Sequence, residues 1–169
     1  MREQDRGSFE EWARARQQQL VRTAYLVTGD HHRAEDLVQE ALVGVAMRWD
    51  TLRDGNPDAW VRTVVYRANV SWWRKHRREV AVEQVPERAA GSPPPGESRM
   101  VIEDALAGLT TKQRAVLLLR FLEDLSVEET AAVLGVSTGT VKKQSSVALQ
   151  RLREHAPHLH DLILAEEAR

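Results

Sequence analysis

The chain has 169 residues, 42% of them hydrophobic and 29% charged, and its formal net charge is −1 at pH 7. This balance is that of globular proteins, with enough apolar residues for one domain or two small ones. The absence of cysteine excludes disulfides and thiolate chemistry and agrees with a reducing compartment. No apolar run approaches the roughly 18 residues of a membrane span, and no apolar signal-peptide segment is present. We therefore expect a cytoplasmic protein without membrane insertion.

Three helices are predicted in the first half of the chain. The first begins at a capping box, a pattern in which Ser8 and Glu11 bond to each other's backbone N–H groups. The second spans residues 32–49, where apolar residues repeat every four positions. The third begins at Asn56–Pro57, because asparagine is a favoured N-cap and proline a favoured first helical residue.

Residues 79–98, EVAVEQVPERAAGSPPPGES, are predicted to be a linker. Their four prolines and two glycines exclude a continuous helix, and the GSPPPG core should be extended and solvated. All five tryptophans precede this segment, so the two sides have different cores. We therefore predict two small domains joined by a Pro/Gly-rich linker.

The second half is also predicted to be helical, over residues 99–109, 110–123 and 126–135 and in one further helix. Two more capping boxes, which begin at Thr110 and Ser126, mark the starts of the second and third of these. No stretch alternates with period two for long enough to predict a strand. The predicted fold class is therefore all-α.

The stretch LGVSTGTVKK, residues 134–143, indicates a turn between two packed helices. Gly135 supplies the positive φ of a sharp turn, and Ser137 or Thr138 caps the helix that follows. The inward side of that helix comprises Val141, Ala148, Leu149 and Leu152, with Ser145 as a weak point. Its outward side comprises Thr138, Thr140, Lys142, Lys143, Gln144, Ser146 and Arg151.

These outward side chains suit a DNA major groove. Lysine and glutamine hydrogen-bond base edges, while threonine, serine and arginine hold phosphates. The prediction is a helix-turn-helix whose second helix enters the groove. The alternative interpretation is a helical hairpin with a solvated basic face.

The near-neutral net charge conceals a strong segregation of charge. Residues 60–78 contain six Arg or Lys and no acid, and residues 137–153 contain four and no acid. The balancing acids lie elsewhere, for example in residues 30–40 and 123–129. Two basic helices on an otherwise acidic chain create local fields that attract a polyanion.

Both halves resemble one family. LTTKQRAVLLLRFLEDLSVEETAAVLGVSTGTVKKQSSVALQRLR resembles region 4 of bacterial sigma-70-type sigma factors, whereas GDHHRAEDLVQEALVGVAMRW and AWVRTVVYRANVSWWRKHRR resemble region 2. Their order, with a short linker and no region 3, is similar to the extracytoplasmic-function (ECF, group IV) sigma factors. The resemblance implies region 2 over residues 8–78, a linker over 79–98, region 4 over 99–154 and a tail over 155–169.

The resemblance implies a function in transcription initiation. In this family, region 4 binds the minus-35 promoter element, region 2 binds and opens the minus-10 element, and the linker runs near the RNA exit path. Core RNA polymerase and promoter DNA are therefore the implied partners, and an anti-sigma factor is a further candidate. The family's polymerase contact corresponds here to Asp36, Leu37, Gln39 and Glu40. Without the family, an acidic helix face would be interpreted as simply solvated.

The chain departs from the family pattern at two places. Members often have Ser-Arg after GTVK, where this chain has Lys143 and Gln144, so its minus-35 contacts should differ. The family's minus-10 asparagine aligns with Arg67, and Asn69 lies two residues away. Both are kept as candidates, with Asn69 preferred because its side chain has both a donor and an acceptor.

The remaining minus-10 candidates lie in the loop at 47–57 and along the basic helix. In similar proteins that loop holds a flipped base, for which Arg53, Asp54 and Asn56 offer polar edges. Trp72 and Trp73 are adjacent, so one ring is expected in the core and the other towards a nucleic-acid strand. The complete minus-10 set is Arg53, Asn56, Arg67, Asn69, Trp72, Arg74, Lys75, Arg77 and Arg78.

No catalytic constellation and no cofactor motif occurs, so we predict that the protein is not an enzyme and needs neither cofactor nor metal. The spacing of His155, His158 and His160 matches no common structural zinc site. Apolar residues of the tail, such as Leu159 and Leu162, are expected to pack either on region 4 or on a partner. The main alternative function is a one-component helix-turn-helix regulator, which would need a ligand-sensing N-terminal domain.

Overall fold

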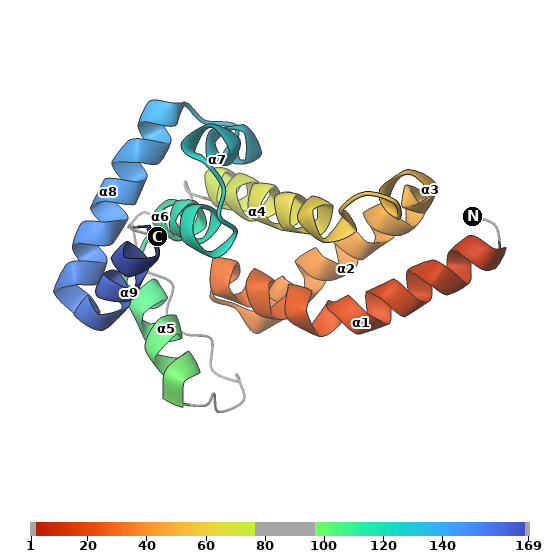
Figure 1. Ribbon diagram of the computed structural model, residues 1–169, viewed down its shortest axis with the longest axis horizontal. Helices are drawn as coiled ribbons and strands as arrows, with labels where there is room; N and C mark the ends of the chain where they lie inside the picture. The colour runs from red at the N-terminus through yellow and green to blue at the C-terminus, as the bar shows by residue number, and fades with distance from the viewer. Residues whose placement is uncertain (1–2, 77–96, 168–169) are drawn as a thin grey trace. The chain divides into compact units, whose positions relative to one another are not determined.

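The computed structural model describes residues 3–76 and 97–167, and over these residues it is helical with no strand (Figure 1). The predicted all-α class is confirmed. The chain forms two compact units, Met1–Asn69 and Val70–Arg169. The linker predicted at 79–98 lies outside the described residues except for its last two, which belong to a helix.

The helices are labelled in Figure 1 in chain order. Before the linker lie α1 (Glu3–Thr28), α2 (His31–Met47), α3 (Trp49–Leu52) and α4 (Pro57–His76). After it lie α5 (Glu97–Ala107), α6 (Thr111–Leu117), the π-helical segment η1 (Leu118–Leu122), α7 (Val127–Leu134), α8 (Thr138–His155) and α9 (Pro157–Glu167).

The core of the first unit lies between α1, α2 and α4. Helices α1 and α2 run side by side (Figure 1). Their apolar faces meet as the helical repeat predicts, because residues three and four apart share one side of a helix. The core includes Leu20 and Ala24 of α1, Val38, Ala41 and Val45 of α2, and Val61 and Val65 of α4.

The predicted start of α1 is wrong, because the helix already begins at Glu3. Ser8 lies inside it and does not cap it. Its hydroxyl donates to the Asp5 carbonyl at 3.0 Å and accepts from the Trp49 indole N–H at 2.8 Å. A partner 41 residues away therefore occupies the oxygen that a capping box would use.

Side-chain caps begin α2 and α4. Asp30 accepts from the Arg33 N–H at 3.0 Å and begins α2 one residue earlier than predicted. Asn56 accepts from the Ala59 N–H at 2.9 Å, and Pro57 is the first residue of α4, as the sequence predicted. The helix predicted to continue to residue 49 ends at Met47 instead, and the short α3 follows.

Trp60 of α4 lies directly against Gly44 of α2. A Cβ on Gly44 would lie 2.5 Å from the indole Cη2 atom, which is closer than any real contact. The Arg48 guanidinium lies 5.7 Å from the centre of the same ring and donates to the Gly44 carbonyl at 3.2 Å. The absence of a side chain at residue 44 leaves the space that the Trp60 ring occupies.

We expect Gly44→Ala to destabilise the first unit by about 1–3 kcal/mol, the usual cost of overpacking a filled core. Urea unfolding followed by tryptophan fluorescence measures this, since Trp12, Trp49 and Trp60 lie in the first unit. The matched control is Gly7→Ala in α1, where nothing lies within 4 Å of an added Cβ. There the helix should gain about 0.5–1 kcal/mol. Equal midpoints for the two variants would contradict the packing argument.

The sequence correctly predicted the starts of two helices in the second unit. Both capping boxes form: Thr110 with Gln113 begins α6, and Ser126 with Glu129 begins α7. The hydrogen bonds from Ser126 lower the pKa of Glu129, because they favour its charged form. Helix α6 passes into η1, which ends at Leu122 with Glu123 as its C-cap, close to the predicted end at residue 123.

The helix-turn-helix consists of α7 and α8. Gly135 ends α7 with φ of 64°, and Ser137 caps α8 by accepting from the Thr140 N–H at 3.1 Å. Of the four predicted inward residues of α8, Val141, Ala148 and Leu152 are buried, and Leu149 is partly buried. Ser145 is the expected weak point, because its buried hydroxyl has no hydrogen-bond partner among the described residues.

Helix α9 packs against α8. Ile163 is buried and Leu159 is partly buried, whereas Leu162 is exposed. The tail was expected to pack either on region 4 or on a partner. Its buried apolar side chain, Ile163, shows that it packs on the helix-turn-helix unit. No helix within residues 3–76 and 97–167 has the length and apolar character that crossing a membrane requires.

Candidate polymerase and nucleic-acid interfaces

The outward side of α8 presents the predicted basic and polar residues. Thr138, Lys142, Lys143 and Ser146 are exposed, while Thr140, Gln144 and Arg151 are partly buried. Val141 lies on the opposite side and is fully buried, so packing sets which way the helix faces. Helix α8 thus offers two adjacent lysines with no acid beside them, which suits contact with phosphates and base edges.

Two residues of this set also have structural partners. The Thr140 hydroxyl lies 2.9 Å from the Ser137 hydroxyl and so belongs to the cap of α8. The Arg151 Nη1 donates at 3.0 Å to the Gln113 Oε1, the same oxygen that accepts from the Thr110 N–H. Arg151 therefore joins α8 to the start of α6 instead of extending outwards as predicted.

Arg151→Ala and Lys142→Ala should consequently have different effects on stability and on the salt dependence of DNA binding. Loss of the bond to Gln113 is expected to lower the stability of the second unit by about 1–2 kcal/mol, with little change in the salt dependence of DNA binding. Lys142→Ala should instead leave stability unchanged and reduce the slope of log K against log salt by about one. Far-UV circular dichroism in urea and a salt titration of DNA binding measure both. A reduced slope for Arg151→Ala would return it to the phosphate contacts.

The acidic face of α2 is exposed where the sequence placed it. Asp36, Gln39 and Glu40 are exposed, whereas Leu37 packs against the core of the first unit. The sequence interpretation missed Val43 and Met47, which are 60% and 78% exposed.

These two apolar residues continue the acidic face of α2. Positions 36, 40, 43 and 47 follow the helical repeat, so this spacing was the signal that could have found them. We call Asp36, Gln39, Glu40, Val43 and Met47 the α2 face. It joins carboxylates to two exposed apolar side chains, and methionine is among the residues enriched at protein–protein interfaces.

Asn69 and Arg67 of α4 have opposite environments. Asn69 is fully buried, and its side-chain amide donates to the Val27 carbonyl at 3.3 Å. Its backbone carbonyl accepts from Arg33, whose pKa is lowered to about 10 by burial, with Asp30 opposing the shift. Arg67 is exposed. The preference for Asn69 as the base reader is therefore corrected, because its side chain is part of the core.

The end of α4 carries the predicted tryptophan pair. The two rings lie edge to face, with centroids 5.2 Å apart and planes at 83°. Trp72 is 38% exposed and Trp73 is partly buried, so Trp72 is the more exposed of the two rings. Arg74 and Lys75 are exposed beside them, whereas Arg77 and Arg78 lie outside the described residues.

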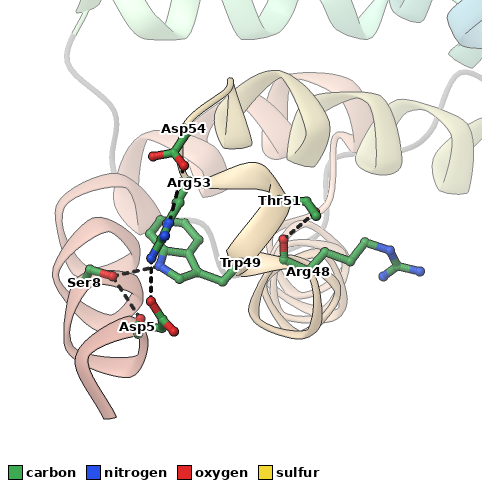
Figure 2. A network of polar contacts seen from close by, with 7 residues as sticks. All are labelled: Asp5, Ser8, Arg48, Trp49, Thr51, Arg53 and Asp54. Carbon is green, nitrogen blue, oxygen red and sulfur yellow. Dashed lines mark hydrogen bonds and ion pairs between the residues drawn. The ribbon is translucent and has the colours of Figure 1, made fainter. Parts of the chain in front are cut away.

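The connection that precedes α4 is anchored to α1, as Figure 2 shows. The Arg53 guanidinium forms an ion pair of 2.5 Å with Asp5, and its Nε lies 3.5 Å from Asp54. The Trp49 indole reaches Ser8 in the same part of α1. Asn56 uses its side-chain oxygen to cap α4 but remains exposed. The predicted polar edges are thus present, and two of them, Arg53 and Asp54, already take part in ion pairs.

Comparison with known proteins agrees with this arrangement of surfaces. Residues 12–79 match Sigma-70 region 2, and residues 105–154 match Sigma-70, region 4. The chain is 43% identical over 149 residues to the RNA polymerase sigma-E factor of Streptomyces avermitilis. The aligned residues make up 86% of this chain and 83% of the relative. It is 27% identical to the ECF RNA polymerase sigma factor SigX of Bacillus subtilis, over 90% and 85% of the two chains.

A solved structure has the same fold. The sigma factor RpoE of Bartonella quintana, crystallised in complex with the anti-sigma factor NepR, superimposes with a TM-score of 0.64 at 28% identity, over 87% of this chain and 95% of that one. The region 2 match occupies the half in which a one-component regulator would need its ligand-sensing domain. The chain belongs to the sigma-70 family, in its ECF group, and is an alternative sigma factor that directs RNA polymerase to promoters.

Proposed function

We propose that this sigma factor binds core RNA polymerase through the α2 face. The observation that carries the proposal is the separation of surfaces: an acidic and apolar face on the region 2 match, and a basic face on α8 in the region 4 match. Asp36 and Glu40 suit a basic partner surface, and Val43 and Met47 supply apolar area that is costly to leave in water.

On the DNA side, α8 reads the minus-35 element through Lys143 and Gln144. Thr138, Lys142 and Ser146 hold phosphates beside them, since they are exposed on the same helix. The minus-10 element is held by α4 and the connection before it. The residues proposed for it are Arg53, Asn56, Arg67, Trp72, Arg74 and Lys75.

The proposed division of the chain follows these roles. Region 2 occupies residues 8–78 and region 4 residues 99–154, with the linker at 79–98 and the tail at 155–169. The protein acts in the cytoplasm as an initiation factor, and the polymerase carries out the chemistry. An anti-sigma factor is a proposed regulatory partner, supported by the complex in which the Bartonella quintana relative was crystallised.

Run-off transcription tests the function directly. Core polymerase reconstituted with the chain should start transcription at discrete sites in a genomic fragment library, whereas core polymerase alone should not. Specific promoter binding should also require core polymerase, which a repressor would not need. Unchanged start-site choice across the library would contradict the proposal.

Arg67→Ala and Asn69→Ala separate base reading from folding. Arg67→Ala should change the preference for one minus-10 base by about 1–3 kcal/mol, the value of a good base contact. Asn69→Ala should lower the stability of the first unit by about 1–3 kcal/mol, because the Val27 carbonyl loses its buried donor. Open-complex formation on promoters with substituted minus-10 bases, together with urea unfolding, measures both effects. An altered base preference for folded Asn69→Ala would restore Asn69 as the reader.

A further inference from the structure

Arg53, a proposed minus-10 contact, has two ion-pair partners: the exposed neighbouring Asp54, and Asp5, which lies outside the matched family region. Asp5 lies upstream of residue 12, where the region 2 match begins. Its side chain is 5% exposed, whereas that of Arg53 is 37% exposed. The pair therefore has a buried end at Asp5 and a more exposed end at Arg53. Figure 2 shows that Asp5 lies on α1 and Arg53 on the connection before α4.

The same part of α1 holds α3 in place. Trp49 donates to the Ser8 hydroxyl, and that hydroxyl donates in turn to the Asp5 carbonyl. The rings of Phe9 and Trp12 lie 5.5 Å and 5.4 Å from the Trp49 ring. The first three turns of α1 thus contact the segment from Trp49 to Arg53 by an ion pair, a hydrogen bond and aromatic packing.

Asp5 is much more buried than Arg53, and this difference determines which groups can compete for each of them. The Asp5 carboxylate is almost fully buried, so a competitor that draws Arg53 away from it weakens an interaction of a poorly solvated charge, which is unfavourable. A nucleic-acid phosphate is therefore a poor competitor for Arg53. The exposed part of the guanidinium, in contrast, remains accessible while Asp5 holds the group. An arginine held in one orientation loses less rotamer freedom on binding than a mobile one, and its planar donors keep a defined direction.

We infer that Asp5 is a positioning residue for minus-10 recognition: it orients Arg53 so that the exposed donors of the guanidinium meet one base of the opened strand. This inference rests on the proposed minus-10 role of the segment before α4. Asp5 itself does not touch DNA. Its contribution appears as base preference, since a fixed donor discriminates between base edges better than a mobile one.

The test uses reconstituted holoenzyme and single-stranded oligonucleotides that carry the non-template minus-10 sequence of a promoter opened by the wild type, with each base substituted in turn. Asp5→Asn keeps the shape of the side chain and removes its charge. Glu10→Gln is the matched control, because it removes an exposed carboxylate that pairs with Arg6 at 3.0 Å in the same part of α1. Affinity for core polymerase and urea unfolding are measured alongside.

We expect Asp5→Asn to reduce the preference at one minus-10 position about tenfold, with core affinity unchanged and Glu10→Gln like the wild type. Arg53→Gln should give the same reduction, and the double variant should add nothing further, because both changes remove one oriented group. If Asp5→Asn does not fold, Arg53→Lys tests the same inference. It keeps a cation for Asp5 and loses the planar fork, so the same reduction is expected.

Unchanged base preference in folded Asp5→Asn or in Arg53→Lys would overturn the inference, as would additive losses in the double variant. Reduced stability with full preference would show that the ion pair serves only the fold, and would overturn it equally. If the wild-type holoenzyme itself does not discriminate between minus-10 bases, the proposed minus-10 role fails instead. The two failures are therefore distinguishable.

Discussion

Replacing Asp36 and Glu40 together by lysine is expected to weaken binding to core polymerase about a hundredfold or more. Like charges brought together in an interface cost several kcal/mol, and each tenfold in affinity corresponds to about 1.4 kcal/mol. Both side chains are exposed, so the helix content of the variant should be that of the wild type. A fluorescence titration against core polymerase and far-UV circular dichroism measure the two quantities.

The control is the double reversal of Glu10 and Glu11, which changes the charge of the same unit equally at exposed positions of α1. Its core affinity should remain close to that of the wild type. Equal losses in the two variants would indicate a general charge effect, and no loss in either would return Asp36 and Glu40 to a solvated acidic face.

The second large effect is expected at the recognition helix. Lys143→Ala and Gln144→Ala should each change the preference for one minus-35 base by about 1–3 kcal/mol, the value of a good base contact. Holoenzyme binding to promoters with each minus-35 base substituted measures the preference. Lys142→Ala is the control on the same exposed side, and it should weaken all sequences alike. A uniform loss for Gln144→Ala would assign Gln144 to phosphate contact.

The capping interactions show how far local sequence predicts structure. Asn56 with Pro57, Thr110 with Gln113, and Ser126 with Glu129 were each predicted correctly. In these motifs both partners lie within three residues, so the backbone geometry of a helix start brings them together whatever packs around it.

Ser8 shows where that reasoning fails. Its sequence pattern is the same as that of Ser126, but the Trp49 indole occupies its hydroxyl from 41 residues away. Arg151 fails in the same way, because the oxygen that it bonds lies on α6, 38 residues earlier in the chain. A polar side chain on an apparently exposed face can have a long-range partner, and helical periodicity contains no information about such a partner.

The sequence by itself determined the helical class, the turn at Gly135 and the separation of acidic from basic faces. These features depend on residue type and on spacing within a few turns. Only the tertiary structure decided that Asn69 is buried against Val27, that Val43 and Met47 extend the α2 face, and that Asp5 holds Arg53. The physical reason is that burial and long-range pairing arise when helices pack, and the free energy of a polar group depends on what packing brings next to it.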